Sequence, residues 1–167
     1  ENGDSESMLK LAKMSNIGDG IPINKKEAAK YYKMAADRGI PEAMETYGWM
    51  LDNSDGIAGD KREAAKYYKM AADNGSVEAM FNYGWMLQIG DGIPDDKKEA
   101  ARYYKVAADN GNIEAMENYA YMLKSGDGIP KDEEEAEKEI ENATEDREQQ
   151  SETTADFSKT ASGILDG

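Results

Sequence analysis

The sequence predicts an all-α protein, a right-handed α-solenoid made of helix-turn-helix repeats of 36 residues. The first observation is a turn motif that recurs every 36 residues, as Gly20-Ile21-Pro22, Gly56-Ile57-Ala58, Gly92-Ile93-Pro94 and Gly128-Ile129-Pro130. The second is the run that starts at Ala28 and returns from Ala64 and from Ala100. The third is an apolar composition dominated by Ala, Tyr and Met, which favours helices over strands. Self-similarity at this period indicates stacked helix pairs.

The first helix of each unit, here called helix A, is expected to begin at a capping box. A short polar residue is followed three positions later by Glu in Asn24/Glu27, Asp60/Glu63, Asp96/Glu99 and Asp132/Glu135. In such a box the polar side chain accepts from an early helix N–H, and the acid accepts from the N–H of the cap residue. Helix A should end at Gly39, Gly75 or Gly111, where glycine suits a left-handed stop.

The second helix, here called helix B, is expected to begin near Pro41, because proline is tolerated in a first turn. It should end before the Asp-Gly turns at Asp55, Asp91 and Asp127. Helical spacing places apolar residues on one face of each helix, namely Ala28, Tyr32, Ala35 and Ala36 on helix A and Ala43, Tyr47, Met50 and Leu51 on helix B. Small residues such as Gly48 should let the helix axes approach closely.

The two ends of the array are expected to be half repeats. Residues 6–16 align with helix B, so we interpret the chain, which starts at Glu1, as a piece of a longer array or a processed product. Residues 131–147 align with helix A, but Glu139-Ile140 replaces the Tyr-Tyr pair, which suits a cap that faces water. The predicted organisation is therefore an array over 1–147 and an acidic polar tail over 148–167.

The tail from Gln149 is rich in Ser, Thr, Asp and Gly and is interpreted as linker or disorder. It holds Phe157, Ile164 and Leu165 among acids and hydroxyls. Three roles remain open: a connector to a downstream region, a short linear motif, or a ligand for the array's own groove.

The repeat unit resembles the Sel-1-like repeat family, which is related to the tetratricopeptide repeat. The resemblance rests on an Ala-rich helix A that ends in Ala71-Ala72-Asp73-Asn74-Gly75, followed by Ala79 and by Gly84 after an aromatic residue. It covers residues 6–147. The chain departs from the family pattern at Tyr47, Tyr83 and Tyr119, where Leu is usual, at Met34, Met70 and Val106, where polar residues are common, and at Ala120, where Gly is usual.

The resemblance implies a protein–protein interaction scaffold or adaptor, not an enzyme. A regulatory subunit that activates a partner enzyme is the alternative, and a hydrolase is a minor one, because some disulfide-rich relatives have been described as hydrolases. The chain has neither Cys nor His, which excludes thiol nucleophiles, disulfides and Ser-His triads. A cytoplasmic location is favoured, and secretion or the lumen of the endoplasmic reticulum stays open.

The predicted partner site is a stripe on helix A, on the concave face of the solenoid. Each unit repeats a base, an aromatic residue and an apolar residue there: Lys30, Tyr31 and Met34; Lys66, Tyr67 and Met70; Arg102, Tyr103 and Val106. These bases would hold an extended or helical acidic segment of a partner, or the chain's own tail. The alternative is that the Tyr and Met side chains pack between neighbouring helices.

A second recurrence on helix B, at Trp49, Trp85 and Tyr121, points away from the expected core face. Exposed aromatic residues in a row often mark contact surfaces. The alternative is that each ring covers the neighbouring inter-repeat loop.

The net charge of −15 in 167 residues makes nucleic acid and anionic membranes poor partners, and no apolar run is long enough to span a bilayer. The segment from Asp52 to Gly56 resembles a calcium loop only superficially, because its glycine is one place too early. We therefore expect no metal ion and no cofactor.

Overall fold

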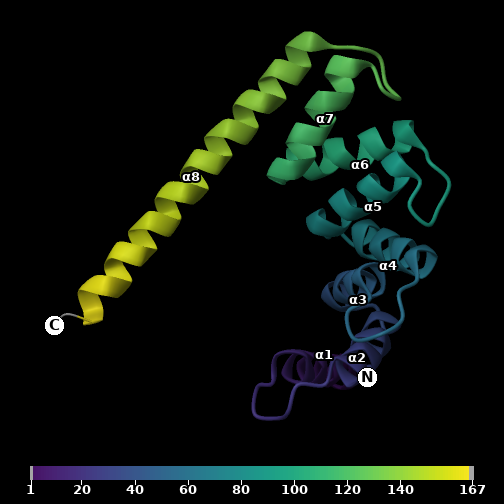
Figure 1. The fold of residues 1–167 in the computed structure, drawn as a ribbon, viewed down its shortest axis with the longest axis vertical. Helices are drawn as coiled ribbons and strands as arrows, with labels where there is room; N and C mark the ends of the chain where they lie inside the picture. Colours follow the sequence, from purple (N-terminus) through teal and green to yellow (C-terminus); the bar gives the residue numbers. More distant parts are fainter. Residues whose placement is uncertain (1, 166–167) are drawn as a thin grey trace.

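The computed structural model describes the backbone of residues 2–165 and the side chains of residues 4–154. In this part of the chain, helices A and B alternate along a curved array (Figure 1). The bounds are α1 Asn2–Ile17, α2 Lys25–Ala36, α3 Pro41–Asn53, α4 Lys61–Asp73, α5 Val77–Ile89, α6 Lys97–Asp109, α7 Ile113–Ser125 and α8 Glu133–Leu165. The even-numbered helices are helix A and the odd-numbered ones are helix B. The predicted all-α solenoid is confirmed.

Of the two hydrogen bonds predicted for each capping box of helix A, only the one accepted by the cap side chain forms. The side chains of Asn24, Asp60, Asp96 and Asp132 accept from the N–H three residues on, at 2.9–3.1 Å. The N–H of each cap residue, however, donates to a carbonyl in the last turn of the preceding helix B. The pairs are Asn24 with Ser15, Asp60 with Leu51, Asp96 with Leu87 and Asp132 with Leu123. The predicted return bond from the acid is therefore wrong, and the cap fastens helix A to its neighbour instead.

The turn between helix A and helix B follows the sequence closely. Gly39, Gly75 and Gly111 have φ values of 90°, 91° and 85°, a left-handed conformation that glycine adopts without the Cβ penalty of other residues. Helix B then begins at Pro41, Val77 or Ile113, and the side chains of Ser76 and Asn112 cap the last two. These short turns make each helix pair antiparallel.

The core lies between the two helix rows, and its narrow points hold small residues. Gly48 faces the ring of Tyr68 and Gly84 faces the ring of Tyr104, each on the next helix A. A Cβ added at either glycine would lie 3.1 Å from Cδ1 of that ring, which is tighter than ordinary contact. Glycine therefore lets helix B of one unit pack against helix A of the next.

The C-terminal end differs from the prediction. The tail does not become linker at Gln149, because α8 continues to Leu165. No proline or glycine interrupts residues 131–162, so a helix nucleated on α7 can propagate through them. Arg147 pairs with Glu117 of α7 at 2.9 Å, and beyond it α8 projects away from the array (Figure 1). The side chains of Phe157, Ile164 and Leu165 lie outside the described residues.

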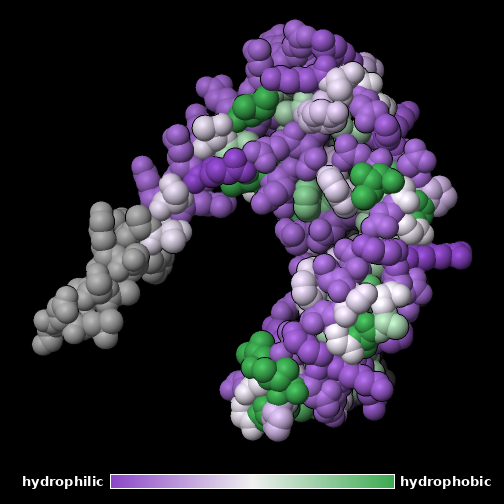
Figure 2. All heavy atoms as spheres, in the orientation of Figure 1, coloured by the Kyte–Doolittle hydropathy of each residue, from purple (hydrophilic) through white to green (hydrophobic). Residues whose placement is uncertain are grey.

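The cap that we expected to face water is also arranged differently. Glu139 is buried, with 7 % of its surface exposed, whereas its neighbour Ile140 is 39 % exposed. Glu139 occupies the buried place that Tyr67 and Tyr103 fill in the preceding units. Ile140 occupies the place of the buried Tyr68 and Tyr104 but is partly exposed at this end of the array. Between α8 and the rest of the array the molecule is hollowed (Figure 2).

Candidate functional site

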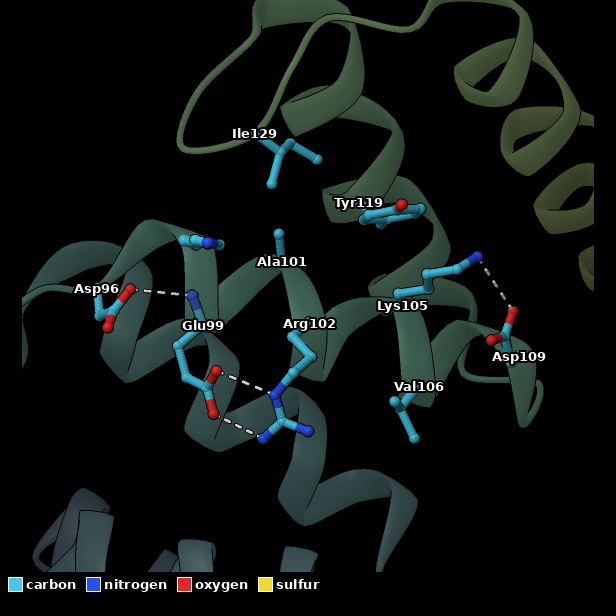
Figure 3. A pocket seen from close by; sticks show the side chains of 10 residues that line it. Asp96, Glu99, Ala101, Arg102, Lys105, Val106, Asp109, Tyr119 and Ile129 are labelled. Atoms are coloured by element: carbon cyan, nitrogen blue, oxygen red, sulfur yellow. Dashed lines mark hydrogen bonds and ion pairs between the residues drawn. The ribbon is translucent and has the colours of Figure 1, made fainter.

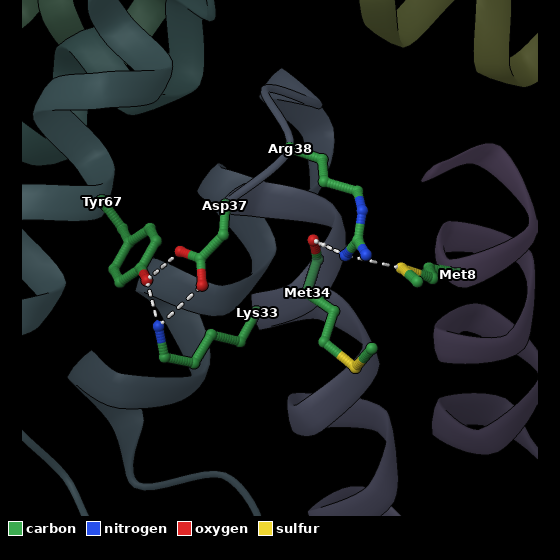
Figure 4. A network of polar contacts seen from close by, with 6 residues as sticks. All are labelled: Met8, Lys33, Met34, Asp37, Arg38 and Tyr67. Atoms are coloured by element: carbon green, nitrogen blue, oxygen red, sulfur yellow. Dashed lines mark hydrogen bonds and ion pairs between the residues drawn. The ribbon is translucent and has the colours of Figure 1, made fainter. Parts of the chain in front are cut away.

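A three-residue polar network joins consecutive helices A on the predicted partner face (Figure 4). Lys33 Nζ on α2 donates to Tyr67 Oη on α4 at 2.7 Å and to Asp37 Oδ2 at 3.0 Å. Tyr67 Oη in turn donates to Asp37 Oδ1 at 2.8 Å. The hydrogen bond to Tyr67 raises the pKa of Lys33. Partial burial acts to raise the pKa of Asp37, but the bonds from Tyr67 and Lys33 bring it below its usual value.

The predicted role of the tyrosines as exposed partner residues is wrong for two of the three. Tyr67 is 0 % exposed and Tyr103 is 5 % exposed. Each ring meets a helix-B tyrosine edge to face: Tyr67 with Tyr47 at 4.8 Å between centroids, and Tyr103 with Tyr83 at 5.0 Å. Tyr31, in the first unit, is half-buried against the core. The packing alternative is correct for Tyr67 and Tyr103, because these two rings fill the space between neighbouring repeats.

The bases of the predicted stripe are exposed, and the apolar residues are half-buried beside them. Lys30, Lys66 and Arg102 are open to solvent, whereas Met34, Met70 and Val106 are half-buried. Lys66 Nζ lies 5.4 Å from the ring centre of Tyr67, and the Arg102 guanidinium lies 4.6 Å from that of Tyr103. Arg102 also binds both carboxylate oxygens of Glu99, at 3.0 and 2.6 Å. The buried rings of Tyr67 and Tyr103 thus make cation–π contacts with the exposed bases beside them.

A cavity of about 680 Å³ opens beside α6 and contains two predicted residues, Arg102 and Val106 (Figure 3). Ala101, Val106, Tyr119 and Ile129 supply its apolar surface. Charged side chains form its rim, namely Asp96, Lys98, Glu99, Arg102, Lys105 and Asp109. An apolar pocket with a polar rim can bind an apolar side chain and orient the chain that carries it.

The junction between α7 and α8 lacks the tyrosine pair of the preceding units. In the two preceding units a helix-A tyrosine packs edge to face on the helix-B tyrosine, as described above. Here α8 carries Glu139 at that place, and the ring of Tyr119 lines the cavity instead. Lys105 Nζ lies 5.3 Å from the Tyr119 ring centre and 3.2 Å from Glu135 Oε1. Burial raises the pKa of Glu139.

Sequence reasoning missed Ala101, Lys105, Tyr119 and Ile129 as lining residues. A signal was present, since the exchange of tyrosine for Glu139 breaks the repeat at this junction. The sequence alone does not say which helix lies opposite position 139, so the exchange by itself favours a cap that faces water.

The helix-B aromatic residues are exposed, as their place in the repeat predicted. Trp49 is 47 % exposed, Trp85 is 45 % exposed and Tyr121 is 60 % exposed. About half of the surface of each ring is therefore open to solvent.

The described residues offer neither a cluster of metal ligands nor a membrane-spanning helix. Among them, no group of three or more Asp or Glu side chains is placed to hold a metal ion. None of the helices in the described part is both long and apolar enough to cross a membrane.

The chain is similar to known proteins in both sequence and structure. The Sel1 repeat model matches four consecutive segments, residues 5–40, 41–76, 77–112 and 113–138, which together span most of the chain. The chain belongs to the Sel1 repeat family. Sel1 repeats are a protein–protein interaction fold, so this array is placed among proteins of that kind. A search of curated proteins found no matching sequence.

Solved Sel1 repeat structures superpose well on this array. The protective antigen c5321 of uropathogenic Escherichia coli, which has an SLR fold, is 26 % identical with a TM-score of 0.82 over 86 % of this chain and 31 % of its own. A Sel1 repeat protein from Oxalobacter formigenes is 27 % identical, with a TM-score of 0.80 over 87 % and 60 %. The Helicobacter pylori cysteine-rich protein B shares the fold at 19 % identity and a TM-score of 0.56, over 68 % and 90 %. This chain thus spans less than two thirds of the first two proteins.

Proposed function

We propose that this Sel1 repeat array is a binding scaffold that holds an acidic segment of a partner protein across the exposed side of its A helices. An apolar side chain of that segment enters the cavity beside α6. The observation that carries the proposal is the cavity itself, whose volume of about 680 Å³ falls within the usual range for ligand pockets. The entering side chain would cover the apolar surface of the cavity. Each Å² of apolar surface removed from water contributes about 25 cal/mol to the free energy of binding.

The charge of the A helices supports an acidic partner. Helices α2, α4 and α6 carry twelve Lys or Arg residues and five Asp or Glu residues, within a chain whose net charge is −15. Part of this positive charge is compensated inside the chain, by pairs such as Lys33 with Asp37 and Arg102 with Glu99. The exposed bases Lys30 and Lys66 hold the same place on α2 and α4 as Arg102 on α6, and they would contact acids that flank the anchor.

The position of α8 favours a partner from another molecule over the chain's own tail. Helix α8 runs away from α2 and α4 and stays apart from them along its length (Figure 1). It packs mainly on α7, as in the pair Arg147–Glu117, and reaches α6 through the pair Lys105–Glu135. The cavity and the stripe are thus open to a second protein while the tail remains helical.

Selection from a random peptide display library, with the full chain as bait, tests the proposal. We expect enriched peptides to share one large apolar residue with acids near it. Val106→Glu should weaken their binding at least tenfold, because a carboxylate would stand on the apolar surface of the cavity. Val77→Glu is the matched control, since Val77 is half-buried like Val106 but lies on α5, outside both the stripe and the cavity. If no peptide is enriched, or if both variants bind equally well, the cavity is not the anchor site.

A further inference from the structure

The B helices carry a second surface whose apolar residues gather on α5. Trp85 is 45 % exposed and Ile89 is 53 % exposed, and Phe81 is half-buried. They lie four residues apart, so they follow one face of the helix. The equivalent positions on the neighbouring helices keep the aromatic residue, Trp49 or Tyr121, but replace its two companions by polar residues. The result is an apolar stripe on α5 with one exposed aromatic ring on each side, here called the helix-B patch.

The helix-B patch is set among carboxylates. Helices α3, α5 and α7 carry six Asp or Glu residues and a single lysine, the reverse of the balance on the A helices. Glu42, Glu78 and Glu114 each stand seven residues before an exposed aromatic residue, which places acid and ring on the same helical face. Glu45 and Glu117 stand four residues before Trp49 and Tyr121 and share that face as well.

These carboxylates are close enough to affect one another across three helices. The pKa of Glu78 is raised mainly by burial and also by the negative charges of Glu45 and Glu114. Hydrogen bonds and ion pairs within the chain compensate some of the acids, including Lys13 with Glu42 at 2.5 Å and Asn112 with Glu78 at 3.2 Å. The side chains of Glu42 and Glu117 nevertheless keep 53 % and 48 % of their surface open. A cation brought to this surface would therefore meet several accessible carboxylates.

We propose that the helix-B patch binds a basic amphipathic segment of a second partner protein, with its apolar residues on Phe81, Trp85 and Ile89 and its Lys or Arg residues among the surrounding acids. Indole faces attract ammonium and guanidinium groups at short range, so Trp49 and Trp85 contribute to the same recognition. Charge complementarity decides the occupant, since an acidic segment or an anionic membrane would be repelled here. This surface lies on the B helices and does not depend on the cavity beside α6, so the chain can connect two partners.

A synthetic peptide of Leu and Lys, patterned for an amphipathic helix, is the probe, and fluorescence anisotropy is the readout. Trp85→Gln combined with Ile89→Asn should weaken its binding to the full chain at least tenfold. Ile23→Asn is the matched control, because Ile23 is 64 % exposed in the loop before α2 and its change is likewise apolar to polar. None of these variants alters the net charge, so unspecific attraction to an acidic chain would leave all of them equal. Circular dichroism verifies that each variant is folded.

Three outcomes would overturn the proposal. One is equal binding of the probe to wild type and to the Trp85/Ile89 variant. Another is equal binding of a Leu and Glu peptide of the same pattern, which would remove the role of charge. The third is a wild-type dimer in sedimentation experiments that the Trp85/Ile89 variant abolishes, since the patch would then be covered by a second copy. Val106→Glu should not affect probe binding, which separates this test from that of the helix-A site.

Discussion

The ring of Tyr104 on α6 lies so close to Gly84 on α5 that a Cβ at that glycine would meet Cδ1 of the ring at 3.1 Å. Tyr104 is 0 % exposed, and its hydroxyl donates to Gln88 Oε1 at 2.8 Å. The ring is thus held at its edge and at its hydroxyl. It has little freedom to move away from a larger side chain at Gly84.

Gly84→Leu should therefore destabilise the array by about 1–3 kcal/mol, because the added side chain forces α5 and α6 apart. Urea unfolding followed by circular dichroism measures the change. Trp85→Leu, on the next and exposed residue of the same helix, should remain within about 0.5 kcal/mol of wild type. An unchanged midpoint for Gly84→Leu would contradict the packing of α5 on α6.

Tyr67→Phe keeps the buried ring and removes the hydroxyl that joins Lys33 to Asp37. We expect a loss of about 0.5–1.5 kcal/mol, toward the lower end because the two charged partners can be rehydrated. Tyr121→Phe is the control, since Tyr121 is 60 % exposed. Since the pKa of Asp37 is lowered in the folded state, its contribution exists above its unfolded pKa and disappears as the pH falls through the folded pKa. The cost of Tyr67→Phe should accordingly be smaller near pH 3 than near pH 7.

Glu139→Tyr should restore the arrangement of the preceding units, with an edge-to-face contact on Tyr119. An aromatic pair of this kind contributes about 0.5–1.5 kcal/mol beyond its buried area. The variant is expected to be more stable than wild type and to bind the selected peptides more weakly, because the new ring would pack on Tyr119, which lines the cavity. If stability rises while peptide binding is unchanged, the anchor does not enter the cavity.

Glu139→Gln tests the charge at the same position. Burial raises the folded-state pKa of this carboxyl above its usual value of 4.5, so ionisation costs stability. The contribution of the neutral acid is complete below 4.5 and disappears as the pH rises through the folded pKa. Glu139→Gln should hence raise the melting temperature by about 1–3 °C near pH 7 and by less in acid. A gain that is independent of pH would mean that ionisation of Glu139 is not its cause.

Removal of residues 150–167 should leave the unfolding of the array within about 0.5 kcal/mol of wild type, since the contact of Arg147 with Glu117 is retained. The same truncation should lower the mean helical signal, because the distal part of α8 is lost. A large drop in stability would show that the distal part of α8 supports the array. If the helical signal is not lowered, the distal part of the tail is not helical and is a linker, as its composition predicts.

The sequence by itself determined the features that depend on neighbours along the chain. The period of 36 residues, the side-chain caps at Asn24 and Asp60, and the glycine stops at Gly39 and Gly75 involve residues only a few positions apart. Helical spacing likewise identified Ala28 and Leu51 as core and Trp49 as exposed. The length of α8 also depends on residues near one another in the chain. The prediction of a linker was wrong because the absence of helix breakers outweighs the polar composition.

Only the tertiary structure decided what happens where two repeats meet. Tyr31 and Tyr67 occupy the same place in their units, yet Tyr67 is completely buried because Tyr47, Lys33 and Asp37 of the preceding unit close around it. Glu139 shares that position and is buried with it, although its own chemistry favours water. Burial depends on which surface of the neighbouring unit lies opposite a side chain, and the pattern within one repeat does not contain that information.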